Sequence, residues 1–155
     1  KISSVISKIF IIYVSLTFIL FGLYFVNGMS IFDAITHSFT TISTGGFSTH
    51  NNSFAFFDNQ SILIIAIIFM ILGSLPFLVI AQTSFKNLFA TFKDHQVRIF
   101  LIILLLSIFI IYFFAQKYLE GNSFSKIITI SFNTISIISG TGYVSTNFEN
   151  WGNYA

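Results

Sequence analysis

The stretch TTISTGGFSTH, residues 40–50, lies between two long apolar segments and contains no acidic residue, lysine or arginine. Most of its residues are Gly, Thr or Ser, and a run of apolar residues at 61–81 follows closely. A related stretch, NTISIISGTGYVST, occupies residues 133–146 after another long apolar segment. A flexible polar sequence that occurs twice in such a setting indicates a repeated structural element.

The composition favours a membrane protein. Hydrophobic residues make up 55% of the chain and charged residues only 8%, whereas a soluble domain has about 25% charged residues. So few charges cannot cover a water-facing surface, and the lipid bilayer is therefore the expected solvent. The net charge of +2 is too small to favour a nucleic-acid partner. The absence of cysteine excludes disulfides, thiolate metal sites and cysteine nucleophiles.

Three stretches are long and apolar enough for a transmembrane helix, which needs about 20 mostly apolar residues. They are residues 9–26, with an extension back to Val5, residues 61–81 and residues 97–115. The second stretch contains GSLP at 73–76. Proline lacks a backbone N–H and clashes with the preceding turn, so we expect a kink there. A packing kink is favoured over a gating hinge.

The basic residues predict the orientation of these spans, because cytoplasmic loops carry an excess of Lys and Arg. We place the N-terminus and residues 82–97 in the cytoplasm, and residues 27–60 and 118–147 outside. Lys1 and Lys8 precede the first span, and Lys86, Lys93 and Arg98 lie between the second and third. We interpret these last three side chains as topology anchors, and contact with a cytoplasmic regulator is the alternative.

A shift of 93 residues aligns the chain with itself. Nine positions between 28 and 43 then match, including Gly28 with Gly121 and Thr41-Ile42-Ser43 with Thr134-Ile135-Ser136. Beyond Ser43 the second copy carries three extra residues. The predicted organisation is a complete span–pore loop–span repeat at 1–82, a cytoplasmic linker at 83–97 and a second repeat at 98–155 that stops after its loop. We therefore expect the chain to be part of a longer polypeptide.

Each repeat contains a short outer segment that we predict to be a helix. Ser30 is a suitable N-cap for the first helix, with Asp33 three residues later, and Ser123 or Asn122 for the second. Each helix would have about 13 residues. That is too short to span a bilayer, but it suits a helix that enters the membrane and returns through the Gly/Thr stretch.

The Gly/Thr stretches suit the coordination of a cation. Non-helical backbone at membrane depth is tolerated only inside protein or beside water, and carbonyl oxygens without partners can replace the hydration shell of an ion. Glycine supplies the backbone conformations that turn carbonyls inward, and the aromatic residue that follows can wedge the loop against surrounding helices. The preceding helix aims its C-terminal dipole at the ion. Uncharged oxygens favour a weakly hydrated monovalent cation that can leave again.

No enzymatic function is predicted, because the chain lacks a phosphate-binding loop, HExxH and GxSxG. Covalent chemistry and a cofactor are not expected. His37 and His50 are not spaced with carboxylates as metal ligands are. We interpret His37 as a packing or hydrogen-bonding residue of the pore helix, with an ion or proton role as the alternative. Asp33 is interpreted as a helix cap, with ion coordination as the alternative.

With these residues considered, the chain resembles the Trk/Ktr/HKT superfamily of potassium uptake proteins, and most of all the bacterial TrkH type. FDAITHSFTTISTGGFSTHNNSF is similar to the second pore loop of that family, and SFNTISIISGTGYVSTNFENWG to the third. The resemblance implies an all-α membrane protein of repeated transmembrane helix–re-entrant pore helix and filter loop–transmembrane helix units, as in potassium channels.

The resemblance also implies function and partners. Potassium ions would be taken up across the bacterial inner membrane through a pore made with the remaining repeats of the same polypeptide. A homodimer and a cytosolic nucleotide-binding regulatory subunit are further implied partners. The first and fourth filter loops, and the closing span with the gate, lie outside this chain. The filter residues that carry over are Thr44, Gly45, Gly46, Gly140, Thr141 and Gly142; residues 44–46 and 140–142 are called the filter segments below.

Two other functions remain open at this point. A secondary transporter for another cation or a small solute would show glycine breaks at matching depths in its spans. Gly22 falls on Ala115 under the 93-residue shift, which does not match that pattern. A non-transporting anchor or assembly subunit would tolerate bulky side chains at the loop glycines.

Overall fold

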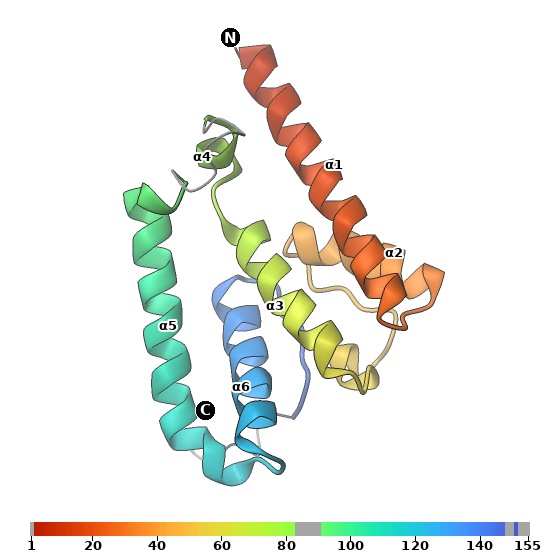
Figure 1. Cartoon of the computed structure of the whole chain (residues 1–155), viewed down its shortest axis with the longest axis vertical. Coiled ribbons are helices and arrows are strands. Elements are labelled where there is room, and N and C mark those ends of the chain that lie inside the picture. Colours follow the sequence, from red (N-terminus) through yellow and green to blue (C-terminus); the bar gives the residue numbers. More distant parts are fainter. Residues whose placement is uncertain (1, 83–90, 148–150, 152–155) are drawn as a thin grey trace.

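The computed structural model describes residues 2–82, 91–147 and 151, and these form helices and loops without a β-strand. The two halves of the chain are built alike (Figure 1). The first half contains α1 (Ile2–Val26), α2 (Ile31–Ile42), the 3-10 helix η1 (Ser53–Phe56), α3 (Gln60–Ser74) and α4 (Phe77–Gln82). The second half contains α5 (His95–Ala115), the 3-10 helix η3 (Gln116–Tyr118) and α6 (Ser123–Ile138).

The long helices α1 and α5 correspond to the first and third predicted spans. Among the described residues, Val5–Val26 and His95–Tyr118 are the stretches long and apolar enough to cross a membrane. Asp94 caps α5, since its Oδ1 accepts hydrogen bonds from the backbone N–H groups of Gln96 (2.9 Å) and Val97 (3.3 Å). In Figure 1 both helices begin at the same end of the molecule, so the N-terminus and the start of α5 share one side, as the basic residues predict.

The second predicted span is broken rather than kinked. Helix α3 ends at Ser74, Leu75 is extended with ψ 145°, and α4 begins at Phe77. Pro76 has no N–H to donate to the α3 ladder, but its carbonyl accepts from Val79 N (2.9 Å) and starts the next helix. The interruption lies in the GSLP sequence, where a kink was predicted, but it ends one helix and begins another instead of only bending the span.

Helix α3 lies between the two halves of the protein (Figure 1) and contacts both α2 and α6. The apolar core around it includes Leu20 and Tyr24 of α1, Met70 of α3 and Phe132 of α6, all fully buried. Gly73 allows a close approach, because a Cβ there would lie 2.8 Å from the Ile42 carbonyl oxygen at the end of α2. The core thus fixes the C-terminal ends of the short helices α2 and α6.

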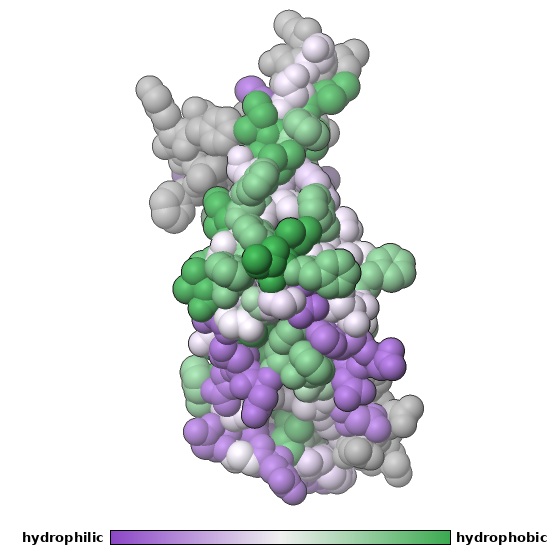
Figure 2. Space-filling model, turned by 90° about the vertical axis from the view of Figure 1, so that its right-hand side faces the viewer, coloured by the Kyte–Doolittle hydropathy of each residue, from purple (hydrophilic) through white to green (hydrophobic). Residues whose placement is uncertain are grey.

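The surface suits a molecule surrounded mainly by lipid. Many large apolar side chains of α1 and α5 are exposed, among them Phe10, Phe18, Phe109 and Phe113. In water such contiguous exposure marks an interaction site or an aggregation hazard, whereas in a bilayer it is the ordinary outer face. Figure 2 shows apolar side chains over the upper part of one face and hydrophilic side chains at the end opposite the N-terminus.

Candidate functional site: two adjoining filter segments

The short helices α2 and α6 end at the two filter segments. The Ser30 hydroxyl accepts from Asp33 N (3.1 Å) and donates to Asp33 Oδ2 (2.7 Å), which confirms the predicted cap. Helix α6 is capped by Asn122, whose Oδ1 accepts from Ser125 N (2.8 Å). In Figure 1 the chain after α6 turns back toward the end from which that helix started. With 12 and 16 residues, the helices extend about 1.5 Å per residue and serve as re-entrant pore helices.

Both filter segments share an alternating backbone. Thr44 and Gly46 have φ values of 51° and 67°, and Gly140 and Gly142 have 75° and 83°, whereas the residues between them do not have positive φ. A shift of 96 residues superimposes the two patterns. Alternating signs of φ turn successive peptide planes over, which allows neighbouring carbonyls to face one side instead of alternating as in a strand.

Thr44 adopts this conformation at a cost. A β-branched residue with positive φ is an outlier, and such strain amounts to about 1–3 kcal/mol and persists where the surrounding structure imposes it. The second copy places Gly140 at the same point. The left-handed conformation therefore occurs in both repeats, although the first copy carries threonine, for which positive φ is unfavourable.

The two filter segments touch each other. A Cβ built on Gly46 would lie 1.7 Å from the Thr141 carbonyl oxygen and 3.5 Å from the Gly142 carbonyl carbon. A Cβ on Gly140 or Gly142 would meet nothing within 4 Å. Position 46 thus has space only for hydrogen, and residues about 95 apart in the chain form one continuous site.

The carbonyl oxygens of residues 44–46 and 140–142 accept no hydrogen bond within the described part of the chain. The carbonyls of two nearby residues are used: Thr40 O, in the last turn of α2, accepts from Gly45 N (2.8 Å), and Tyr143 O accepts from the Ser136 hydroxyl (2.8 Å). Of the six residues with free carbonyls only Thr141 is buried, and the other five are partly or fully exposed in this chain. The free oxygens are therefore accessible to an external group.

Polar side chains anchor each filter loop to its own pore helix. His37 bonds through Nε2 to the Ser48 hydroxyl (2.9 Å) and through Nδ1 to Asp33 O (2.8 Å). Asn133 donates to the Ser145 hydroxyl (2.7 Å) and accepts from Ser145 N (3.1 Å). The interpretation of His37 as a hydrogen-bonding residue of the pore helix is confirmed.

The second filter segment is also fastened to the first repeat. Tyr143 is 1% exposed, and its hydroxyl lies 2.5 Å from the Thr40 hydroxyl and 3.1 Å from the Thr41 hydroxyl. The next residue along, Val144, exchanges hydrogen bonds with η1, donating to the Ser53 hydroxyl (3.2 Å) and accepting from Ala55 N (3.1 Å). Tyr143 wedges the second loop as predicted, and it does so against the neighbouring repeat. For the first loop the prediction was wrong, because Phe47 is 75% exposed in this chain.

A family profile described as TrkH, cation transport protein, matches residues 1–146 of this chain. The chain belongs to the TrkH family. It is 32% identical over 143 residues to the Trk system potassium uptake protein TrkI of Halomonas elongata, covering 91% of this chain and 29% of that protein. It is 31% identical over 155 residues to the Trk system potassium uptake protein TrkH of Vibrio parahaemolyticus, covering 97% and 32%.

The crystal structure of the potassium transporter TrkH from Vibrio parahaemolyticus has the same arrangement. It superposes with a TM-score of 0.86 at 31% identity, over 92% of this chain and 31% of that one. The family resemblance and the membrane fold of helix–pore helix–helix units predicted from the sequence are thereby confirmed. The chain spans about a third of the length of the curated relatives it matches.

Sequence reasoning missed the hydroxyl network behind the TrkH-family filter. The Tyr24 hydroxyl lies 3.1 Å from that of Thr41, so a chain of hydroxyl groups runs from α1 through α2 to Tyr143. The sequence did contain one signal of this network. Under the 96-residue shift Tyr143 aligns with Phe47, so only the second copy carries a hydroxyl at this position. Phe47 has no hydroxyl and is 75% exposed, so the equivalent residues of the two repeats have different surroundings.

The charged residues near the first loop stabilise its outer end. Asp33 Oδ1 accepts from the Thr49 hydroxyl at 2.5 Å and lies 3.2 Å from His50 Nε2, although that contact lacks hydrogen-bond geometry. Burial would raise the pKa of Asp33, but the bonds from Thr49 and Ser30 and the nearby His50 outweigh it and lower the pKa. Among the described residues there is no group of three or more His, Cys, Asp or Glu that could hold a metal ion.

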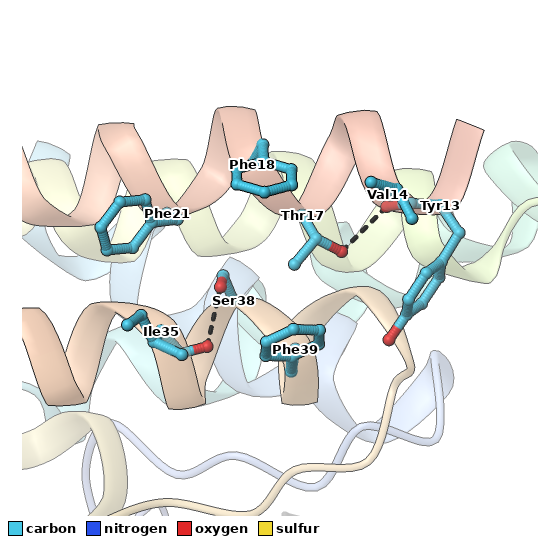
Figure 3. A pocket seen from close by; sticks show the side chains of 8 residues that line it. All are labelled: Tyr13, Val14, Thr17, Phe18, Phe21, Ile35, Ser38 and Phe39. Atoms are coloured by element: carbon cyan, nitrogen blue, oxygen red, sulfur yellow. Dashed lines mark hydrogen bonds between the residues drawn. The ribbon is translucent and has the colours of Figure 1, made fainter. Parts of the chain in front are cut away.

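A groove of about 340 Å³ lies between α1 and α2 (Figure 3). Two of its three hydroxyl groups are already used, because Thr17 donates to Tyr13 O (2.8 Å) and Ser38 donates to Ile35 O (2.8 Å). The third, the Tyr13 hydroxyl, makes no hydrogen bond in the described chain, and the rest of the lining is apolar or aromatic. The groove is therefore mainly a packing surface. In the second repeat the equivalents of its exposed residues Ile35 and Phe39 are Ile128 and Phe132, which are both buried, and Phe132 packs against Phe54 of the first repeat.

Proposed function

We propose that this chain forms two of the filter loops of a potassium uptake pore. The carbonyl oxygens of Thr44, Gly45, Gly46, Gly140, Thr141 and Gly142 would replace part of the water shell of a potassium ion that enters from outside. The observation that carries the proposal is the pair of adjoining segments with the same φ alternation and with six carbonyls free of hydrogen bonds in the described chain.

Electrostatics support a monovalent ion. The two pore helices point their C-terminal ends, which carry partial negative charge, toward the filter segments. No Asp or Glu lies within either segment. Neutral dipoles bind a weakly hydrated ion without holding it as tightly as carboxylates would, which permits conduction. Curated relatives named potassium uptake proteins make potassium the ion of choice.

The pore would be completed by other parts of the same polypeptide. We propose the organisation of a complete repeat at 1–82, a linker at 83–97 and a second repeat at 98–155, with the N-terminus in the cytoplasm and the protein in the bacterial inner membrane. Residues 83–90 of this linker, with Lys86, lie outside the described residues. A homodimer and a cytosolic nucleotide-binding regulatory subunit belong to the same proposal, by resemblance to the family.

The test is rubidium uptake by the full-length protein in cells that lack other potassium uptake. Gly46→Asp and Gly142→Asp place a fixed charge in the filter and should abolish uptake at unchanged protein level in the membrane. Gly22→Ala is the matched control, because its Cβ would meet nothing within 4 Å and it lies in α1, away from the filter. Normal uptake by both aspartate variants would refute the filter and favour an anchor or assembly role.

A further inference from the structure

We propose that the Tyr143 hydroxyl is a positioning group that holds the two filter segments in register, and that its loss weakens discrimination between potassium and sodium more than it slows uptake. This inference rests on the proposed function and assigns to one atom a part in selectivity. Tyr143 contacts no ion in this scheme, since it acts through the pore helix of the other repeat.

The hydroxyl joins the end of one filter to the start of the other. Tyr143 directly follows Gly142, whereas its partners Thr40 and Thr41 lie in the last turn of α2 before the first filter segment. The hydroxyl is 2.5 Å from Thr40 Oγ1 and 3.1 Å from Thr41 Oγ1, and donates to His37 O at 3.4 Å. Three partners at positions 37, 40 and 41, on one face of the same helix, fix the location of the hydroxyl in three dimensions.

Thr40 is the residue that couples the two segments. Its hydroxyl meets Tyr143, and its carbonyl accepts hydrogen bonds from Gly45 N (2.8 Å) and Gly46 N (3.5 Å). A single residue of α2 thus holds the first filter segment through its backbone and the second through its side chain. A displacement of the Tyr143 ring would be passed to the backbone contact between Gly46 and Thr141, where there is no spare space.

Ring packing alone does not set this register. The Tyr143 ring packs against the buried Phe54 with centroids 4.4 Å apart, and apolar contacts of this kind are not directional. The hydroxyl network adds direction and continues to Tyr24 of α1. Replacing Tyr143 by Phe would keep the packing and remove the network, so the two contributions can be separated.

In the second repeat, the threonine equivalent to Thr41 is buried without a hydrogen-bond partner among the described residues. Thr134 matches Thr41 under the 93-residue shift, is 2% exposed, and its hydroxyl has no hydrogen-bond partner in the described chain. A buried polar group left unpaired costs about 1–3 kcal/mol. The Thr41 hydroxyl is paired with Tyr24 of its own repeat and with Tyr143 of the other, each at 3.1 Å, so its pairing does not follow from the helix sequence alone.

The experiment compares variants of the full-length protein by rubidium uptake with and without competing sodium. Tyr143→Phe should keep the maximal rate of rubidium uptake within about twofold, and its preference for rubidium over sodium should fall about fivefold, as expected for one hydrogen bond. Tyr13→Phe is the matched control, because the Tyr13 hydroxyl makes no hydrogen bond in the described chain. It should leave both quantities unchanged.

Two further variants keep the test decisive. Thr40→Val should reproduce the loss of preference, whereas Thr40→Ser keeps the hydroxyl and should retain it. Combining Thr40→Val with Tyr143→Phe should give no further loss, because both remove the same contact. If the valine and serine variants behave alike, or the double variant shows additive losses, the coupling does not exist.

Unchanged preference in Tyr143→Phe would also overturn the inference while leaving the filter intact. The proposed function would fail separately, if the unaltered protein took up rubidium without any preference over sodium or tolerated the aspartate substitutions at Gly46 and Gly142. If the Tyr143→Phe protein is absent from the membrane, the comparison of Thr40→Val with Thr40→Ser decides the question: a loss of preference in the valine variant alone supports the inference, and equal behaviour overturns it.

Discussion

We expect Gly46→Ala to abolish potassium uptake by the full-length protein, although it adds a single methyl group. The Cβ would lie 1.7 Å from the Thr141 carbonyl oxygen, and real Cβ atoms essentially never come within 3.0 Å of such an atom. The two filter segments would therefore separate by at least 1.3 Å at this point (3.0 − 1.7). Ion–ligand distances in proteins hold to about 0.2 Å, so a shift of this size removes carbonyls from the coordination of the ion.

Gly142→Ala is the matched variant that separates crowding from backbone strain. Both glycines have left-handed φ, 67° at Gly46 and 83° at Gly142, and alanine in that conformation costs roughly 1–2 kcal/mol at either position. Only Gly46 also faces a collision, because a Cβ at Gly142 meets nothing within 4 Å. Gly142→Ala should therefore retain measurable uptake.

The assay is the initial rate of rubidium uptake, normalised to the amount of protein in the membrane. The expected order is unaltered protein, then Gly142→Ala, then Gly46→Ala with no uptake above background. Equal rates for the two alanine variants would refute the argument, since strain alone would then explain both and the contact between the segments would be irrelevant to conduction.

Three further outcomes are expected. Gly73→Ala should lower the melting temperature of the purified full-length protein, because its Cβ would lie 2.8 Å from Ile42 O and push α3 away from α2; an unchanged melting temperature would contradict that packing. Asp33 has a lowered pKa, so its stabilising effect should be complete above its ordinary pKa of about 3.9 and be lost as the pH falls through the lowered value. Asp33→Asn should remove that part of the acid sensitivity in melts recorded from about pH 6 to about pH 2, and an identical pH profile would argue against it. In a cysteine-free full-length protein, Asn52→Cys should react with a membrane-impermeant maleimide in intact cells and Ser3→Cys only after lysis; the reverse pattern would invert the proposed orientation.

The re-entrant helices were predictable because their signals are local. A serine cap with an acidic residue three positions later marks the start of α2, and a polar cap, a length too short for a span and the repeated sequence indicate α6 without any tertiary information. The filter role of the loop glycines stays a prediction. Asn122 and Ser123 are both suitable N-cap residues, and the sequence alone does not show at which of these two neighbouring positions α6 begins.

The contacts between repeats were beyond prediction from the sequence. Whether Tyr143 meets α2 or α6 depends on which repeat lies beside which loop, and no local pattern encodes that neighbour. The break between α3 and α4 was underestimated for a different reason. Composition over 20 residues indicates a span, yet the single Pro76 determines where the backbone ladder stops.

The left-handed residue that opens each filter segment has a consequence for how such pores diverge and how they are found. One copy meets the requirement with threonine and the other with glycine, so a duplicated unit has kept a dihedral angle while its side chain drifted. Selection at this point then acts on shape, and residue motifs will overlook distant members. A search for alternating backbone handedness at the end of a short buried helix would recover them.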